Sequence, residues 1–221
     1  ELMRPDNLEQ MDEAVSDRFR LKDRAGRNLG LRYEFTFQLA RILKQNPNMK
    51  LPFKRYQIGP VFRDEPTGTG RYRQFTQCDI DVVGEVGAKG DAEVLACVTD
   101  ILKELNIPAE IQVNNRKLLQ AIIESVEIKE IKEVMRELDK LAKIGEDHVK
   151  MNLKKYADAN QILTLFKLLE KSLSFFIENK FEGASELEAL QNECARYGLQ
   201  VTIAPMMIRG LAYYTGNIFE V

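Results

Sequence analysis

The sequence predicts an α+β fold in which antiparallel strands at both ends of the chain flank a long helical block. Two strand-like runs, 53–62 and 72–83, surround a loop whose proline and glycines are turn signals, which indicates an antiparallel pair. From residue 116 onward apolar residues recur at helical spacing, and strand-like segments return at 199–203 and 213–221. We therefore expect an antiparallel sheet with flanking helices and an all-helical insertion.

The composition limits the classes of protein to which the chain can belong. Of its 221 residues, 30% are charged and 44% are hydrophobic, which is typical of a globular chain with a core. The net charge of −2 gives no global electrostatic case for nucleic-acid binding, so any RNA contact has to come from local basic patches. No segment is apolar and long enough for a membrane span, and no signal peptide is visible.

The cysteines and the histidine favour a reducing, cytoplasmic setting. Cys78, Cys97 and Cys194 are isolated and His148 is the only histidine, which excludes the familiar spaced clusters of zinc sites. The chain opens without Met and stops within a predicted strand, so we expect a piece of a longer protein.

The first elements along the chain are a hairpin and a helix. Residues 18–22 and 29–36 alternate in polarity on either side of a turn around Gly26, which predicts a β-hairpin. Apolar residues then fall at helical spacing, and Thr36 is the expected N-cap of this helix. Glu34 lies just before the cap. From the residues alone, a functional glutamate and a surface glutamate beside a capping threonine are equally good interpretations.

The strand predicted at 72–83 has two different faces, because residues two apart lie on the same side of a strand. The more apolar face is the predicted core face, and it comprises Tyr72, Gln74, Thr76, Cys78, Ile80 and Val82. The other face comprises Arg71, Arg73, Phe75, Gln77, Asp79 and Asp81. Its cations lie at one end and its carboxylates at the other, which suits a ligand with an anionic part, a flat ring and a cationic part. A solvated edge of mixed charge is the alternative.

The later elements are mainly helical. A helix is predicted from Gly90 to about Leu105, followed by a break at Pro108 and a short strand over 109–113. Beyond residue 116, three successive apolar faces predict a packed helical bundle. Lysines between these faces alternate with glutamates, so a solvated surface is the expected role of the charges.

The residues around the predicted strand pair resemble a known family. Phe62-Arg63-Asp64-Glu65, followed by a loop and by Arg71-x-x-x-Phe75-x-x-x-Asp79, resembles motif 2 of the class II aminoacyl-tRNA synthetases. Within that class, residues 70–81 are similar to the histidyl-tRNA synthetases, more to the archaeal and eukaryotic branch than to the bacterial one. The segment Leu31–Thr36 and the signature Arg209–Gly216 also match this family, and all three motifs occur in its order.

The resemblance implies a division of the chain into parts of a class II catalytic domain. Residues 1–113 would form its first part, with motif 2 at 53–84, and residues 114–183 the helical insertion known in the family as a lid near the tRNA acceptor arm. Residues 184–221 would return to the catalytic domain. Motif 1, motif 3 and the anticodon-binding domain are not found in this sequence.

The resemblance further implies ATP-dependent activation of L-histidine to histidyl-adenylate and transfer to tRNA(His), in a protein that is a homodimer at full length. Mg²⁺ would arrive on the phosphates of ATP, without a metal site of protein ligands. By the resemblance, the catalytic residues would be Arg63 and Arg209. The residues that bind ATP would be Arg63, Glu65, Arg71 and Phe75. The residues that bind histidine would be Glu34, Thr36, Gln77, Asp81, Tyr213 and Tyr214. Arg63 would bind the α-phosphate, and adenine would stack on Phe75.

Two other functions stay open. Ala212 replaces the aspartate usual in the signature, which favours a catalytically inactive paralogue such as the regulatory subunit of ATP phosphoribosyltransferase. The lysine-rich helices favour a non-enzymatic RNA-binding or scaffold protein.

Because motif 3 is not found, we expect the isolated chain to be nearly inactive in adenylation and to bind histidine weakly.

Overall fold

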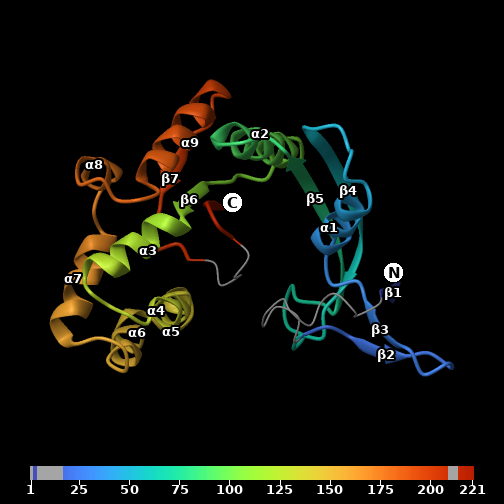
Figure 1. Ribbon diagram of the computed structural model, residues 1–221, viewed down its shortest axis with the longest axis horizontal. Helices are drawn as coiled ribbons and strands as arrows, with labels where there is room; N and C mark the ends of the chain where they lie inside the picture. The colour runs from blue at the N-terminus through green and yellow to red at the C-terminus, as the bar shows by residue number, and fades with distance from the viewer. Residues whose placement is uncertain (1, 4–16, 209–213) are drawn as a thin grey trace. The chain divides into compact units, whose positions relative to one another are not determined.

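The computed structural model describes residues 2–3, 17–208 and 214–221 and divides into two compact units, Glu1–Glu85 and Val86–Val221 (Figure 1). Strands and helices occur in the order that the sequence predicts, with the helical block between two groups of strands. The α+β class is therefore confirmed.

The first sheet of unit 1 contains the predicted hairpin. It consists of β1 (Leu2–Met3), β2 (Arg20–Lys22) and β3 (Asn28–Leu31), paired antiparallel in the order β1-β3-β2. Asp23 closes the turn between β2 and β3, because its Oδ1 accepts hydrogen bonds from the backbone nitrogens of Ala25 and Arg27, at 2.9 Å each. Gly26 has a φ of +76°, which explains the glycine in this turn.

Helix α1 (Thr36–Gln45) begins without the predicted cap. The N-cap residue is Phe35, no side chain caps the helix, and Thr36 is exposed as the first helical residue. The prediction for Thr36 is wrong because a buried ring holds this junction in place of a capping hydrogen bond: Phe35 is 0% exposed. Arg32 covers that ring at 4.7 Å, and its Nε and Nη2 donate to the carbonyl oxygen of Pro60 at 3.0 and 2.6 Å.

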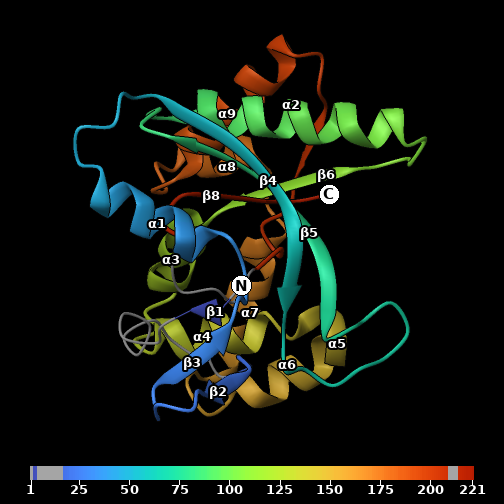
Figure 2. The ribbon, with the colours of Figure 1, turned by 90° about the vertical axis from the view of Figure 1, so that its right-hand side faces the viewer.

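Strands β4 (Phe53–Phe62) and β5 (Gln74–Val83) form the second sheet of unit 1, a long twisted ribbon in Figure 2. They pair antiparallel along their whole length, from Phe53 opposite Val83 to Phe62 opposite Gln74. The strand pair and its loop are as predicted, except that β5 starts two residues later.

The predicted core face of this hairpin is wrong. Tyr72 is 69% exposed. Tyr56 and Ile58 on β4, which lie opposite Ile80 and Cys78 of the predicted core face, are 76% and 63% exposed. The face with Phe75 and Gln77 is the half-buried one. Counting apolar residues misleads here, because the polar face packs on Phe35 and its Asp81 is paired with Arg55.

The sheet of unit 2 joins three segments that are distant in the sequence. It consists of β6 (Ile111–Asn115), β7 (Val201–Ile203) and β8 (Asn217–Glu220), in the order β7-β6-β8. β6 and β8 are antiparallel, whereas β6 and β7 are parallel, which requires a long crossover. The helical block supplies that crossover. Helices α2 (Ala88–Glu104) and α9 (Ala184–Arg196) pack on each other, and α9 also contacts β6 and β7.

The helical block is a packed bundle, as predicted. Its helices are α3 (Arg116–Ser125), α4 (Ile131–Leu138), α5 (Leu141–Ile144), α6 (Glu146–Leu153), α7 (Ala159–Leu169) and α8 (Leu173–Glu178). Side-chain caps begin three of them: Asn115 at α3, Asp158 at α7 and Ser172 at α8. The predicted apolar faces are the buried ones, among them Leu118, Ile122, Leu165 and Phe166. None of the described helices is both long and apolar enough to cross a membrane.

The Gly183→Ala substitution is expected to destabilise unit 2 through its contact with the cap of α3. Gly183 has a φ of +83°, and an added Cβ would lie 2.5 Å from Asn115 Oδ1 and 2.6 Å from the backbone nitrogen of Leu118. Left-handed backbone costs about 1–2 kcal/mol for a residue other than glycine, and the overlap adds about 1–3 kcal/mol. Gly198→Ala is the matched control, since its φ is +71° but nothing lies within 4 Å of the added Cβ. Urea unfolding should show the larger loss for Gly183→Ala, and equal losses would contradict this packing.

Candidate functional site

Arg63 is a half-buried cation beside the polar face of the hairpin. Its guanidinium carbon lies 4.6 Å from the centre of the Tyr33 ring and 5.0 Å from that of Phe75, so two aromatic rings hold it. Nη2 donates to Gln77 Oε1 at 3.4 Å, and the buried Nε has no hydrogen-bond partner within the described part of the chain. Arg63 is therefore a positioned cation that keeps donor capacity for an anionic ligand.

Gln77 lies between a cation and a carboxylate. While its Oε1 accepts from Arg63, its Nε2 donates to Asp79 Oδ1 at 2.7 Å. Burial raises the pKa of Asp79, and the hydrogen bond from Gln77 acts against that rise. Asp79 was included in the polar row of the sequence analysis but received no role there.

Asp81 is paired with an arginine that the sequence analysis missed. Arg55 Nε donates to Asp81 Oδ2 at 2.7 Å, and the two side chains are only 12% and 18% exposed. The remaining nitrogens of Arg55 reach Gln57 Oε1 at 2.6 Å and the Phe35 carbonyl oxygen at 3.2 Å. Arg55 lies directly opposite Asp81 in the strand pair. Reading β4 with the same two-residue period as β5 would have found it.

The start of α1 reaches the same polar face. Gly59 on β4 lies against the ring of Phe35, where an added Cβ would be 3.3 Å from Cζ. Glu34, just before Phe35, is buried, and its negative charge raises the pKa of Arg18, whose burial acts more strongly in the opposite direction. Thr36 is exposed. Tyr33, on the other side of Glu34, packs on Arg63, so this segment supplies side chains that the predicted site needs.

Two further predicted residues of unit 1, Arg71 and Glu65, are not part of this cluster. Arg71 is exposed in the loop between β4 and β5, where its backbone exchanges two hydrogen bonds with Gly68. Glu65 is partly exposed, and its carbonyl oxygen accepts from Arg73 Nε at 3.3 Å. Tyr214 belongs to unit 2 and is partly buried there. Arg209 and Tyr213 lie outside the described residues.

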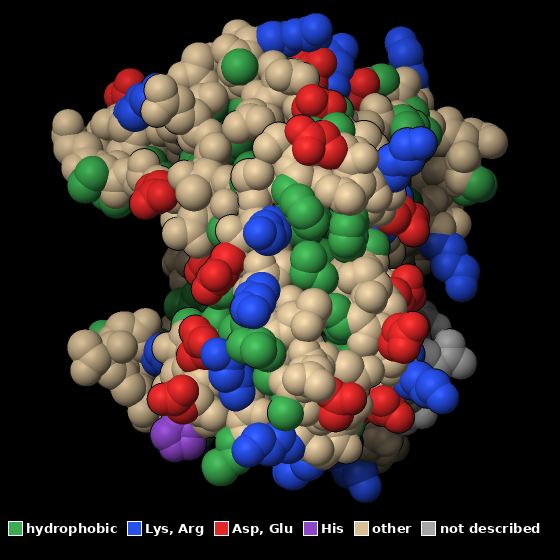
Figure 3. Space-filling view, turned by 90° about the vertical axis from the view of Figure 1, so that its left-hand side faces the viewer, with side chains coloured by type: hydrophobic (Ala, Val, Ile, Leu, Met, Phe, Trp, Pro, Cys, Tyr) green, Lys and Arg blue, Asp and Glu red, His purple; other side chains and the backbone are tan. Residues whose placement is uncertain are grey.

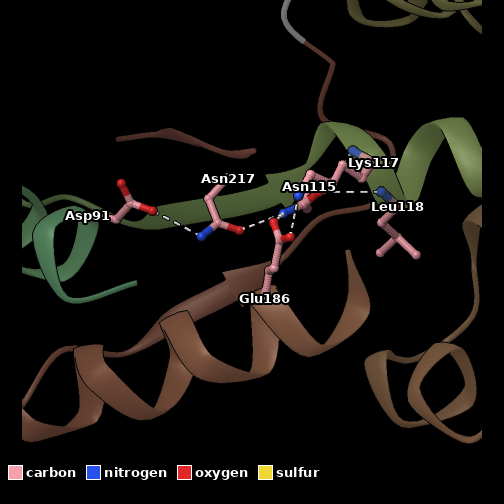
Figure 4. Close-up of polar contacts among 6 residues, drawn as sticks. All are labelled: Asp91, Asn115, Lys117, Leu118, Glu186 and Asn217. Carbon is pink, nitrogen blue, oxygen red and sulfur yellow. Dashed lines mark hydrogen bonds and ion pairs between the residues drawn. The ribbon is translucent and has the colours of Figure 1, made fainter. Parts of the chain in front are cut away.

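A second polar cluster, in unit 2, was not predicted (Figure 4). Its centre is Asn115, which is 0% exposed and uses both ends of its amide. Oδ1 accepts from the backbone nitrogens of Lys117 and Leu118 at the start of α3, at 2.9 and 3.4 Å. Nδ2 donates to Glu186 Oε2 on α9 at 2.8 Å and to Asn217 Oδ1 on β8 at 2.9 Å.

The outer members of this cluster carry charge. Asn217 Nδ2 donates to Asp91 Oδ2 on α2 at 3.0 Å, and Lys117 Nζ lies 2.5 Å from Glu186 Oε1. Burial raises the pKa of Asp91, whereas the hydrogen bond from Lys117 lowers the pKa of Glu186. The cluster thus fixes the start of β8, directly after the Arg209–Gly216 signature, to three helices.

Comparison with solved structures defines the class of the fold. Over 99% of the chain, the structure superposes on the histidyl-tRNA synthetase from Nostoc sp. PCC 7120 with a TM-score of 0.80 and 30% identity, covering 55% of that chain. An ATP phosphoribosyltransferase regulatory subunit/histidyl-tRNA synthetase from Bacillus halodurans C gives a TM-score of 0.83 at 19% identity and covers 61% of that chain. The fold is that of a class II synthetase catalytic domain.

Sequence comparison identifies the family. The pattern of the histidyl-tRNA synthetase family matches residues 4–221, and the chain therefore belongs to that family. It is 38% identical over 224 residues to histidine--tRNA ligase 1 of Bacillus cereus (strain ATCC 10987 / NRS 248), covering 95% of this chain and 51% of that protein. Histidine--tRNA ligase of Finegoldia magna is 37% identical over 218 residues, covering 90% of this chain and 51% of that protein.

These relatives correct one expectation and show how much of their length the chain covers. They are bacterial, so they do not support the predicted likeness to the archaeal and eukaryotic branch. The chain spans about half the length of the curated relatives that it matches.

Proposed function

We propose that this chain is part of a histidine--tRNA ligase and carries much of its histidine and α-phosphate site. The observation that carries the proposal is the Arg63 guanidinium, held between Tyr33 and Phe75 and hydrogen-bonded to Gln77. Family membership supports the reaction: ATP-dependent activation of L-histidine to histidyl-adenylate, then transfer to tRNA(His). The enzyme would be a homodimer at full length and would work in the cytoplasm.

In the first step the carboxylate of histidine attacks the α-phosphate of ATP and displaces pyrophosphate. This step needs positioning and charge stabilisation and no covalent protein nucleophile. Arg63 would bind the α-phosphate, since a planar guanidinium pairs with two of its oxygens. Adenine would stack on Phe75, Glu65 would accept from its amino group and Arg71 would reach the outer phosphates. Arg209 would be the second charge stabiliser, opposite Arg63.

Mg²⁺ would be carried by ATP and would neutralise phosphate charge. In the described ranges no three His, Cys, Asp or Glu side chains are grouped to hold a metal ion. Asp79 and Asp81 are bound by Gln77 and Arg55.

Histidine needs acceptors for its ammonium group and polar partners for its ring nitrogens. Gln77, Glu34 and Thr36 would bind the ammonium group, and Asp81 would accept a hydrogen bond from the imidazole, with Tyr213 and Tyr214 beside the ring. The pair between Arg55 and Asp81 supports this role, because it orients the carboxylate and leaves one of its oxygens for the ligand. We further propose that residues 114–183 form the family's helical insertion near the tRNA acceptor arm.

A catalytically inactive, histidine-binding paralogue is the second candidate. The likeness in fold to the Bacillus halodurans protein and Ala212 in the signature favour it. A role as a general RNA-binding scaffold has less support. On the face shown in Figure 3, acidic side chains lie among the lysines and arginines, so that face offers no continuous basic surface.

Calorimetric titration with L-histidine and with the other amino acids tests the proposed substrate. The chain should bind L-histidine, weakly, in preference to the others. Gln77→Ala should weaken this binding about 10-fold or more, since hydrogen bonds to charged groups contribute about 1.5–3 kcal/mol. Arg24→Ala, an exposed residue of the β2–β3 turn, is the control and should leave it unchanged. A folded chain with no preference for histidine would contradict the proposal.

A further inference from the structure

Gln77 is an ambiguous ligand by itself. A glutamine amide can present either its oxygen or its nitrogen to a substrate, and which one it presents depends on its neighbours. In the hairpin the amide has one neighbour of each polarity. Asp79 can only accept when ionised, and it takes the Nε2 hydrogen at 2.7 Å. Arg63 can only donate, and its Nη2 lies 3.4 Å from Oε1.

The two neighbours together permit one orientation of the amide. Turning it over would place Oε1 against the Asp79 carboxylate and the NH2 group against the Arg63 guanidinium, which loses both hydrogen bonds and brings like polarities together. The contact with Asp79 is the stronger of the two, because it is shorter and involves a partly buried carboxylate. Oε1 therefore stays on the side of Arg63, where one of its lone pairs accepts from Arg63 and the other is left for a ligand.

We infer that Asp79 is a positioning residue that holds Gln77 with its oxygen as the ligand-facing acceptor. This inference rests on the proposed function, in which Gln77 binds the ammonium group of histidine. A cationic donor on the substrate suits an oxygen and is repelled by an NH2 group. Asp79 would thus determine specificity for an amino-acid ammonium group while acting only through Gln77.

The surroundings of Asp79 hold it in place. Asp79 is directly opposite Gln57 in the strand pair, and Gln57 is itself bound by Arg55 Nη1 at 2.6 Å. Arg55 and Arg63 attract the Asp79 carboxylate, while Asp81 repels it. The family resemblance assigned no role to Asp79, although it assigned roles to Gln77 and Asp81 on the same strand.

Asp79→Asn tests the inference, because it keeps the shape of the side chain and gives it a group that can donate as well as accept. The amide of Gln77 is then free to turn over. The dissociation constant for L-histidine should rise about 10- to 100-fold, the range expected when a hydrogen bond to a charged group is lost. Asp100→Asn, on the exposed surface of α2, is the matched control and should leave it unchanged.

A double-mutant cycle separates positioning from direct attraction of the ligand by the Asp79 charge. If Asp79 acts through Gln77, then Asp79→Asn should change histidine binding less than about twofold when Gln77→Ala is already present. Additive effects, or unchanged binding in the Asp79→Asn single variant, would overturn the inference and leave the proposed function standing.

The side-chain amide of Gln77 provides a readout that does not depend on histidine. In nuclear magnetic resonance spectra of the chain its NH2 protons should exchange slowly, and Asp79→Asn should speed that exchange while the signals of unit 2 stay in place. If the unchanged chain does not bind histidine, the proposed substrate fails, and this exchange measurement still decides whether Asp79 holds Gln77. Equal exchange rates in both proteins would overturn that contact as well.

Discussion

Arg63→Ala is expected to lower the rate of adenylate formation at least about 100-fold in the longer protein that carries this chain. The reason is the loss of one preorganised charge stabiliser, which typically costs a factor of about 10²–10³. Arg63→Lys should restore only part of the rate, because an ammonium group lacks the planar fork that pairs bidentately with phosphate oxygens and the flat face that a guanidinium offers to the rings of Tyr33 and Phe75. Single-turnover formation of histidyl-adenylate is the measurement.

Arg24→Ala is the control for this substitution. Arg24 is exposed in the turn between β2 and β3 of the same unit, so its loss should leave the rate within about twofold. The proposed role of Arg63 fails if Arg63→Ala forms adenylate at the rate of the unchanged protein.

Asn115→Asp is expected to destabilise unit 2 by about 3–5 kcal/mol, the range seen when a buried charge is left without its partner. The substitution removes the two N–H donors that reach Glu186 and Asn217. It also places a carboxylate beside Glu186 at a position that is 0% exposed. Chemical unfolding, followed by the helical signal, would show a lower midpoint.

Asn192→Asp is the matched control for this prediction. Asn192 lies on the exposed side of α9, the helix that also carries Glu186, so the same change of chemistry there should cost less than about 0.5 kcal/mol. Similar losses for the two variants would show that the Asn115 cluster does not hold the helices and β8 together.

The extent of the hairpin β4–β5 could be predicted from the sequence because its signals are local. Alternation and turn residues gave β4 with its observed ends, and they gave the polar row that contains Gln77 and Asp81. The buried face could not be predicted in the same way. It depends on Phe35 and Arg32, which come from another segment and pack on β4, so alternation within one strand does not reveal it.

Long-range polar contacts account for most of what was missed. Asn115 and Asn217 are 102 positions apart, and Asn217 and Asp91 are 126 apart, so no spacing in the sequence joins them. Only the capping role of Asn115 had a local signal, an asparagine before the first apolar turn of α3. Arg55 was within reach of the method, because the strand pair places it opposite Asp81. The ligand-binding roles of all the predicted site residues stay predictions, and Arg209 and Tyr213 lie outside the described residues.

Histidine-dependent exchange of pyrophosphate into ATP, measured on the longer protein, tests the central claim most directly. An enzyme that activates histidine should exchange pyrophosphate only when L-histidine is present, and Arg63→Ala should reduce that exchange at least about 100-fold. A folded protein that binds histidine without any histidine-dependent exchange would contradict the claim and would support the inactive paralogue.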